Sequence, residues 1–317
     1  MNNQKTLVLL IIVLVGLITF LGGYLIAQKG HSLQQANISA LEKFSSSNIK
    51  TQPKNEPELL RLSTAKADAP YISEDGKKII YTERDSEKTF ATDFSGQNNN
   101  AIETEKAPIL GRNISGTVLS KNRQKIAYLF FDPTTEEGQI SVANPSGSVF
   151  KNILPTRASK LKLDWVSDNQ ISFYNPDGDD HSLFLLDIEN KNLEKVLDSL
   201  SGLKISWSPD GSKLLYSHQE EGESKLSLLD LKTKTNLAID LQAKADQCAW
   251  GLSSLFVYCG NEKLYQLDIS KKEFGLVFQP SPADQIRIKK PLLSPAENYF
   301  FFINDLDGYL YRINLNN

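Results

Sequence analysis

By residue type, His181 and His218 are the best candidates for binding a metal ion. They follow predicted strands at corresponding positions of neighbouring repeats, so the two imidazoles could share a ligand or a metal ion. The only other histidine is His31, and the chain has just two cysteines. Because a zinc centre is built from three or four such ligands, we expect both histidines to be polar loop residues, and we expect no metal.

Two loops are rich in aspartate, "NPDGDDH" at 175–181 and "NDLDG" at 304–308. Their carboxylates belong to Asp177, Asp179, Asp180, Asp305 and Asp307. Calcium takes six to eight oxygen ligands, and neither loop has the twelve-residue pattern that supplies them. Asn-Pro-Asp-Gly is also an ordinary turn sequence. We therefore expect turns here rather than a calcium site.

Cys248 and Cys259 flank a hairpin that is centred between Ser253 and Ser254. A two-residue turn would place the cysteines directly opposite each other, with Cα atoms about 4.5–5.5 Å apart and within disulfide reach. A longer turn, as in the other repeats, would shift the register and separate the thiols. Two alternatives are therefore open, a cross-strand disulfide and two buried free cysteines.

The elements that must position these residues repeat along the chain. A polar turn and a β-branched or aromatic strand recur six times, each time after one of the apolar residues Ile72, Leu119, Trp165, Trp207, Trp250 and Leu293. These leading residues are 47, 46, 42, 43 and 43 positions apart. A period of about 40–45 residues made of short strands is typical of a propeller. We predict an all-β fold, a six-bladed β-propeller of four-stranded blades over residues 58–317.

Each part of the repeat has an expected place in a blade. Pro209-Asp210-Gly211 has the residues of a hairpin turn between the first and second strands. A carboxylate that can accept backbone N–H groups precedes the last turn of three blades, at Asp187, Asp230 and Asp268. The three tryptophans are interpreted as packing anchors between blades.

The last repeat supplies only three strands before Asn317. Residues 58–64, "ELLRLST", are apolar and precede the first repeat without an assigned place. A ring closed by the two ends of the chain leaves no open sheet edge. We therefore predict that residues 58–64 pair with the third strand of the last blade as its fourth strand.

The segments "ISWSPDGSKLLYS" and "SKLSLLDLKTKTNL" resemble the repeat of TolB-type propellers, which is similar to the propeller of prolyl oligopeptidase-like peptidases. The resemblance covers about residues 58–317. It implies a bacterial, exported protein used for protein contacts. The peptidases also need a hydrolase domain with a G-x-S-x-G nucleophile elbow, and this sequence has no such motif. We therefore expect that the chain is not an enzyme and has no catalytic or cofactor-binding residues.

Residues 6–27 are uncharged, almost wholly apolar and long enough to cross a bilayer. A signal peptide has a shorter apolar core and a small-x-small cleavage site, so we favour an uncleaved anchor over a cleaved signal. Lys5 and the amino terminus favour a cytoplasmic N-terminus and an extracytoplasmic propeller. We predict a tail and anchor at residues 1–28 and a flexible linker or stalk at residues 29–57.

The net charge of −3 gives no general signal for nucleic acid. The one local basic run, "QIRIKKP" at 285–291, is predicted to be a solvated loop that leads into the last inner strand. The six loops between second and third strands carry fifteen acidic and three basic residues. The connections between blades lean positive through Arg112, Arg157, Lys160, Lys204, Arg287, Lys289 and Lys290. This predicts one face with an acidic rim and a more basic centre, although solvated loop tips carry such charges too.

Two functions of different kinds fit these features. The first is a membrane-anchored extracytoplasmic propeller that acts as a protein-interaction or scaffold module, with protein partners at the cell envelope and no nucleic-acid partner. The alternative is a ligand-, sugar- or ion-binding propeller, or an enzyme, with its site at the channel mouth, where the inner strands place Lys162, Lys204 and Gln247. Charged groups that converge in the channel would favour the second function, and an apolar or plugged channel the first.

Overall fold

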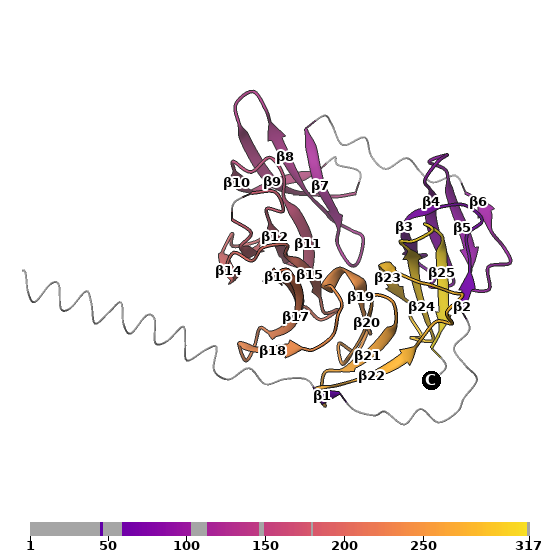
Figure 1. Cartoon of the computed structure of the whole chain (residues 1–317). Coiled ribbons are helices and arrows are strands. Elements are labelled where there is room, and N and C mark those ends of the chain that lie inside the picture. Colours follow the sequence, from indigo (N-terminus) through magenta and orange to yellow (C-terminus); the bar gives the residue numbers. More distant parts are fainter. Residues whose placement is uncertain (1–44, 47–58, 103–112, 146–148, 179, 316–317) are drawn as a thin grey trace, which may run out of the picture. The chain divides into compact units, whose positions relative to one another are not determined.

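The computed structural model describes residues 45–46, 59–102, 113–145, 149–178 and 180–315, and they form the predicted six-bladed propeller (Figure 1). The blades are five antiparallel four-stranded sheets and one sheet of four antiparallel strands with a fifth strand added in parallel. Within these ranges no helix has both the length and the apolar character needed to cross a membrane. The predicted anchor, residues 6–27, lies outside them.

The strands follow one another along the chain, blade by blade. Blades 1 to 3 consist of β3 (Ala67–Ile72), β4 (Lys78–Glu83), β5 (Thr89–Asp93) and β6 (Asn100–Ala101); β7 (Ile114–Leu119), β8 (Ile126–Asp132), β9 (Glu137–Ala143) and β10 (Phe150–Thr156); and β11 (Lys162–Ser167), β12 (Gln170–Tyr174), β13 (Leu183–Asp187) and β14 (Leu193–Leu197). Blades 4 to 6 consist of β15 (Lys204–Trp207), β16 (Lys213–Glu220), β17 (Glu223–Asp230) and β18 (Thr235–Ile239); β19 (Cys248–Trp250), β20 (Phe256–Gly260), β21 (Leu264–Asp268) and β22 (Glu273–Phe278); and β23 (Ile288–Leu293), β24 (Tyr299–Asn304), β25 (Leu310–Asn314) and β2 (Leu59–Arg61).

The first strand of each blade is its inner strand. The hairpins between first and second strands form one side of the ring, called here the hairpin face. The opposite side, called here the entry face, carries the turns between second and third strands and the connections between blades. One connection, between blades 4 and 5, contains the 3-10 turn η1 (Ala245–Gln247).

The two ends of the described chain close the ring as predicted. β2 pairs antiparallel with β25, with Leu59 opposite Ile313, Leu60 opposite Arg312 and Arg61 opposite Tyr311. Figure 1 shows this first strand of the propeller beside the last one. The pairing continues past the strand, where Leu62 N–H donates to Leu310 O at 2.8 Å. The sixth blade therefore takes its outer strand from the beginning of the domain.

One strand falls within the predicted linker. β1 (Ser45–Ser46) pairs parallel with β22, with Ser45 opposite Glu273 and Ser46 opposite Phe274. This makes blade 5 a five-stranded sheet. The polar composition of the linker did not predict it, since a two-residue strand has no hydrophobic alternation.

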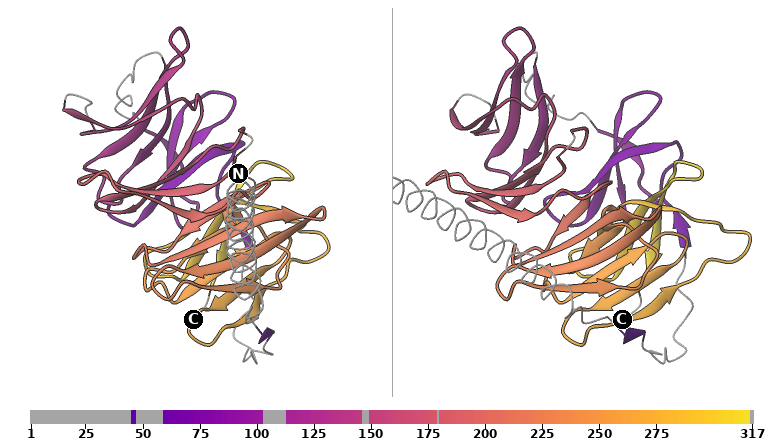
Figure 2. Two further views of the ribbon diagram at one scale, coloured as in Figure 1. Left: turned by 90° about the vertical axis from the view of Figure 1, so that its left-hand side faces the viewer. Right: turned by 60° about the vertical axis from the view of Figure 1, so that its left-hand side comes forward.

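The hydrophobic core lies between neighbouring blades rather than within one sheet. Leu215 and Leu228 of blade 4, for example, share a buried cluster with Val257 and Leu267 of blade 5. Figure 2 shows the sheets of these later blades stacked beside one another. Buried clusters of this kind join blades 2 and 3, 3 and 4, 4 and 5, 5 and 6, and 6 and 1. Blades 3 to 6 therefore bury apolar side chains on both faces, which explains why their strands read as nearly continuous apolar runs.

The tryptophans join adjacent blades by packing and hydrogen bonds, in agreement with the interpretation from the sequence. The indole N–H of Trp165 donates to Val118 O of blade 2 at 3.1 Å. In the same way Trp207 donates to Ser172 Oγ of blade 3 at 2.8 Å, and Trp250 to Ser206 O of blade 4 at 3.2 Å. Each ring thus fills an interface and satisfies its one donor there.

The turns have the predicted chemistry. Asp210 accepts hydrogen bonds from Ser208 Oγ at 2.6 Å and Ser212 N–H at 3.1 Å. Burial acts to raise the pKa of Asp210, but the hydrogen bonds to its carboxylate outweigh burial and hold the pKa at about 2. Gly211 has φ +70°, and a Cβ there would lie 2.8 Å from Val166 O of blade 3. Glycine therefore serves both the turn and the close contact of two blades.

The aspartates before the last turn of each blade also cap backbone groups as predicted. Asp187 accepts from Glu189 and Asn190 N–H, Asp230 from Lys232 and Thr233 N–H, and Asp268 from Ser270 and Lys271 N–H. These bonds hold the final hairpins of blades 3, 4 and 5 in one conformation.

A lysine links three blades across the hairpin face. Lys121, in the inner hairpin of blade 2, donates from Nζ to Val166 O of blade 3 at 2.8 Å. It also reaches Ser208 O at 3.4 Å and, at a shorter separation, Pro209 O of blade 4. Burial lowers the pKa of Lys121, an effect that the charges of Asp210 and Asp168 oppose. The ammonium group gathers carbonyl oxygens from two blades that follow its own.

A second basic residue of the same hairpin reaches in the opposite direction. Arg123 donates to Ile72 O of blade 1 at 3.2 Å, lies 3.5 Å from Glu74 Oε1, and stacks over the Tyr71 ring at 5.5 Å. Blade 2 is therefore joined to both of its neighbours through side chains of one hairpin.

We predict that Lys121→Met lowers the free energy of unfolding by about 1–3 kcal/mol, because hydrogen bonds from a charged donor to blades 3 and 4 are lost. Lys125→Met, in the same hairpin, is the matched control and should cost under about 0.5 kcal/mol. Urea unfolding of the three proteins measures both differences. Equal stability of the two variants would contradict a linking role for Lys121.

The two cysteines form the cross-strand disulfide, the first of the two alternatives. Cys248 lies directly opposite Cys259 in the pairing of β19 with β20, and their Cα atoms are 4.1 Å apart. Both residues are buried. The expected link between turn length and register is wrong, because β19 and β20 are joined by the same five-residue connection as β15 and β16, and this longer turn still places the two cysteines opposite each other.

Candidate site at the channel mouth

The inner strands enter the ring from the entry face in two different ways. Those of blades 1, 2 and 6 carry a β-bulge, between Asp68 and Tyr71, Ser115 and Val118, and Lys289 and Leu292. The inner strands of blades 3, 4 and 5 have no register shift at the corresponding position, just before their tryptophans. Bulges re-aim side chains and occur often beside functional sites. The three bulged strands belong to consecutive blades, so they occupy one side of the channel.

Each bulge contains a residue in the left-handed region. The φ angles are +45° at Ala69, +61° at Gly116 and +50° at Lys290. A non-glycine residue in this region costs about 1–3 kcal/mol and persists where its surroundings hold it. Ala69 and Lys290 therefore mark strained backbone at the channel mouth, a feature that residue type did not reveal.

Asp164 is the most perturbed charged group of the mouth. It lies on β11, two residues from Lys162 and therefore on the same face of the strand. Burial raises the pKa of Asp164 to about 6, and the charge of Lys162 partly offsets this. Its carboxyl group makes no hydrogen bond or ion pair with any residue that the structure describes. A partly buried carboxyl with a raised pKa and no partner, in the wall of a cavity, is typical of a functional site.

Tyr174 lies near both Asp164 and a second carboxylate, that of Asp246. Burial, together with the charges of Asp164 and Asp246, raises the pKa of Tyr174 to about 12. The Tyr174 hydroxyl donates to Leu203 O at 3.1 Å. Asp246 is exposed and belongs to η1. Two carboxylates thus approach one phenol at the junction of blades 3 and 4.

Of the three residues predicted at the channel mouth, two have no side-chain partner within the described residues and one holds neighbouring blades together. Lys162 and Lys204 begin neighbouring inner strands, and neither side chain has a hydrogen bond or ion pair in the described structure. Gln247 instead donates to Asn261 Oδ1 at 3.3 Å and Ile288 O at 3.1 Å, which fastens η1 to blades 5 and 6. Sequence reasoning named these three residues but missed Asp164, although it belongs to the same "KLDW" segment as Lys162.

A cavity of about 570 Å³ opens between the inner strands of blades 2 and 3. Its walls come from β7, with Ser115 and Gly116, and from β11, with Lys162 and Asp164. Gly116 brings the two walls together, since a Cβ there would lie 2.5 Å from Leu161 O. Clefts of about 300–1,000 Å³ are the size that holds small molecules.

On the opposite side of the mouth, charged side chains form ion pairs with one another. Lys290 pairs with Asp68, and Lys289 pairs with Asp305 at 2.9 Å. A hydrogen bond from Lys290 lowers the pKa of Asp68, and one from Lys289 lowers that of Asp305. Our prediction of a solvated loop is wrong for Lys289 and Lys290, which lie in β23, because the bulge lets the strand begin at Ile288.

The aspartates of the two aspartate-rich loops form hydrogen bonds and ion pairs with nearby side chains, as expected for turns. Asp177 pairs with Lys160 at 2.7 Å, and Asp180 accepts from Ser182 Oγ at 2.6 Å. Asp307 accepts from the Tyr311 hydroxyl at 2.8 Å. Asp179 lies outside the described residues, and within them no group of three or more histidine, cysteine, aspartate or glutamate side chains is placed to hold a metal ion.

The two histidines are held by different contacts. The ring atom Nδ1 of His181 lies 3.0 Å from Asn175 O, and the backbone N–H of His181 donates to Ser199 Oγ. His218 lies in β16, stacks on Tyr216 at 6.1 Å, and has a buried Nδ1 without a partner in the described structure. No described contact joins the two rings.

We predict that Asp164→Asn stabilises the domain at alkaline pH. The pKa of Asp164 is about 6 in the folded protein, above its ordinary value of 3.8. The folded state therefore binds the proton more tightly, and ionisation lowers stability as the pH rises from about 4 to above 6, by at most about 3 kcal/mol. At pH 8 the variant should be more stable by about 1–3 kcal/mol, and near pH 4 the difference should vanish.

Urea unfolding of the variant at pH 4, 6 and 8 tests this prediction. Asp85→Asn, in an exposed turn, controls for the loss of one negative charge. A stability difference for Asp164→Asn that does not change with pH would contradict the raised pKa.

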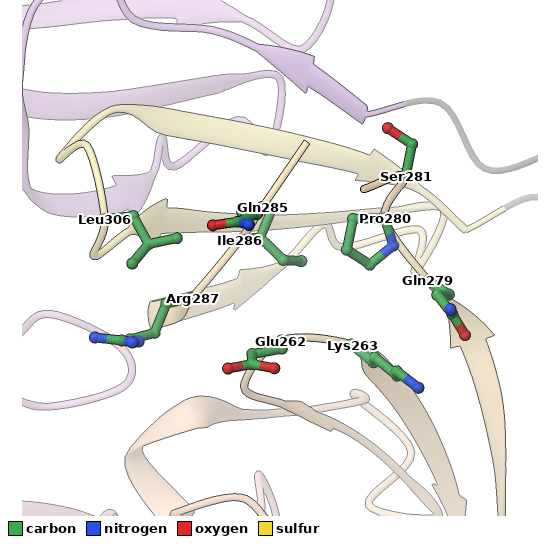
Figure 3. A pocket seen from close by; sticks show the side chains of 9 residues that line it. All are labelled: Glu262, Lys263, Gln279, Pro280, Ser281, Gln285, Ile286, Arg287 and Leu306. Atoms are coloured by element: carbon green, nitrogen blue, oxygen red, sulfur yellow. The ribbon is translucent and has the colours of Figure 1, made fainter. Parts of the chain in front are cut away.

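Two smaller hollows lie on the entry face on either side of blade 5. Both border the tight turn between β20 and β21, with Glu262 and Lys263, and their volumes are about 290 and 380 Å³. The first lies between this turn and the connection to blade 6 (Figure 3). They are separate from the cavity beside Asp164.

Comparisons with known proteins show the fold alone. No family model and no curated protein matches the sequence. Among solved structures, a gluconolactonase from Xanthomonas campestris is 13% identical, covers 82% of this chain and 89% of its own, and has a TM-score of 0.52. An oligogalacturonate lyase from Vibrio parahaemolyticus is 14% identical, covers 80% and 78%, and has a TM-score of 0.50. TolB from Acinetobacter baumannii is a TolB-like neighbour at 12% identity, with 72% and 59% covered and a TM-score of 0.43.

These neighbours correct one expectation. We expected that the chain is not an enzyme, because it lacks the nucleophile elbow of one class of hydrolase. That inference is wrong, since propellers of this fold include a protein named as a lyase and one named as a gluconolactonase. The chain is thus a six-bladed β-propeller whose fold is shared by proteins named as enzymes.

Proposed function

We propose that the channel mouth binds a small hydroxyl-bearing ligand between blades 2 and 3. The observation that supports this most is the partly buried, unpartnered carboxyl of Asp164, with its raised pKa, in the wall of the 570 Å³ cavity. The nearby Lys162 supplies a donor, and the carboxyl supplies an acceptor or, when protonated, a donor. Of the two functions weighed from the sequence, the converging charged groups favour the ligand-binding one.

Asp164 is also the group best placed to exchange a proton with the ligand. A carboxyl with a pKa of about 6 is present in both forms near neutral pH, which is the condition for general acid–base chemistry. The charge of Asp164 also acts on the Tyr174 hydroxyl, so a second titratable group lies near the carboxyl. The reaction, where there is one, then depends on the ionisation of Asp164.

A thermal-shift and ligand-detected NMR screen of monosaccharides, disaccharides and their acid forms tests the proposal. Saturable binding is expected for at least one compound, and Asp164→Asn should weaken it at least about tenfold. Leu276→Asp, far out on β22, is the control and should leave binding unchanged. Absence of saturable binding across the panel, or equal binding by Asp164→Asn, would refute the site.

We also propose that residues 6–27 anchor the chain in the cell membrane with the propeller outside the cytoplasm. The Cys248–Cys259 disulfide supports this location, because disulfides persist mainly in oxidising compartments. Carbonate extraction should leave the chain in the membrane fraction, and external protease should digest the propeller in intact cells. Release of the chain by carbonate would count against the anchor.

A further inference from the structure

A groove on the entry face, separate from the channel mouth, has the features of a protein contact. It lies between blades 5 and 6, bounded by the β20–β21 turn, by the connection from β22 to β23, and by the β24–β25 turn (Figure 3). We propose that this groove binds a short extended peptide segment of a partner protein, which presents an apolar side chain next to a carboxylate.

The groove exists because β20 and β21 are short, with five residues each where β16 and β17 of blade 4 have eight. β20 ends at Gly260, and a Cβ on this residue would lie 2.0 Å from Lys263 O. Only glycine permits that approach, which lets the chain reverse direction within the three residues that separate β20 from β21. In blade 4 the corresponding strands run on to Glu220 and Glu223. The second and third strands of blade 5 therefore extend less far toward the entry face than those of blade 4.

The centre of the groove is apolar. Its floor is Ile286, which is 2% exposed, next to Pro280. At one end stands Leu306, which is 47% exposed although it lies in the polar turn "NDLDG". Figure 3 shows Leu306 and Ile286 on the same side of the groove. An exposed leucine beside an apolar hollow with a polar rim is typical of a protein-contact site.

The rim supplies groups that recognise a peptide. Gln279 and Gln285 border the groove with side chains that can both donate to and accept from a peptide backbone. Glu262, Lys263 and Arg287 complete the rim, and their charged groups have no ion pair or hydrogen bond within the described ranges. By contrast, Lys160, Lys289 and Lys290 on the same face are all paired.

The charged residues that line the groove and the volume of the groove indicate which class of ligand it binds. Among the residues that line the groove, Lys263 and Arg287 against Glu262 leave an excess of one positive charge, since the nearby Asp305 is paired with Lys289. This excess favours a carboxylate on the partner. A volume of about 290 Å³ is at the lower limit for small-molecule pockets and suits a few residues of an extended chain.

Fluorescence anisotropy of the full chain in detergent tests the proposal with three labelled octapeptides, Gly-Ser-Gly-Leu-Glu-Gly-Ser-Gly and its Leu-Lys and Ala-Glu counterparts. The Leu-Glu peptide should bind about tenfold more tightly than either counterpart. Leu306→Asp should weaken it about tenfold, and Arg287→Glu should abolish the preference for Glu over Lys. Leu276→Asp is the matched control, since Leu276 is 42% exposed and lies on the outer strand of the same blade.

Equal binding of the three peptides, or no binding at millimolar concentration, would overturn the proposal. Unchanged binding by Leu306→Asp would also overturn it. So would light scattering that shows a dimer lost in Leu306→Asp, because the groove would then be a contact between copies of this chain. The thermal midpoint of each variant confirms that it is folded, as expected because Leu306, Arg287 and Leu276 are all exposed.

Discussion

Deletion of residues 59–64 is expected to lower the free energy of unfolding by about 4–6 kcal/mol and to make the protein aggregate. The deletion removes β2 from the sixth blade and takes away Leu62, which is 3% exposed against Tyr81 and Phe301. Loss of a buried leucine alone costs about 2–5 kcal/mol. The freed edge of β25 would then present unpaired backbone groups to other chains.

A point variant separates ring closure from the effect of a shorter chain. Leu62→Asp should destabilise almost as much as the deletion, whereas Leu193→Asp, on the exposed outer strand of blade 3, should change stability by under about 0.5 kcal/mol. A synthetic peptide spanning residues 57–66 should raise the thermal midpoint of the deleted protein. A deleted protein that is monomeric and melts like the full chain would show that the ring does not depend on β2.

Removal of the Cys248–Cys259 disulfide is expected to cost about 3 kcal/mol. The cross-link spans 11 residues of sequence separation, and closing a loop of this length restricts the unfolded chain by about that amount. The double variant Cys248→Ala, Cys259→Ala also leaves a small void, because both residues are buried. Urea unfolding with and without a reducing agent measures the difference.

The reducing agent provides the control for this prediction. It should bring the native protein close to the stability of the double variant and should leave the variant itself unchanged. Mass spectrometry of non-reduced peptides should find the two cysteines linked. Two free thiols in protein from an oxidising compartment would contradict both the bond and the register of β19 with β20.

The fold was largely predictable because the signals that define it are local. Each hairpin has its own turn residues, as at Pro209-Asp210-Gly211, and each inner strand has an apolar residue at a fixed period. Closure by β2 followed from counting, since the last blade lacked a strand and residues 58–64 had no place. The tryptophans were interpretable for the same reason, because a large side chain repeated at one position must fill a repeated space.

The candidate site was less predictable because it depends on groups that meet only in three dimensions. Asp164 is unusual only because burial isolates its carboxyl, which the sequence of one strand does not reveal. Ala69 and Lys290 adopt positive φ although neither is a residue that favours it. Lys121 contacts carbonyls about 45 and 88 residues away, at Val166 and Pro209. The inference against enzymatic function failed for another reason, since the absence of one motif excludes one class only.

The ionisation of Asp164 in the free protein tests the proposed site most directly. A carboxyl-detected carbon NMR titration of the isotopically labelled protein, with the resonance assigned through Asp164→Asn, reports it residue by residue. The structure predicts a midpoint of about 6, shifted further when a ligand fills the cavity. A midpoint near the ordinary value of 3.8 would show a solvated carboxylate, and it would contradict a ligand site built around this residue.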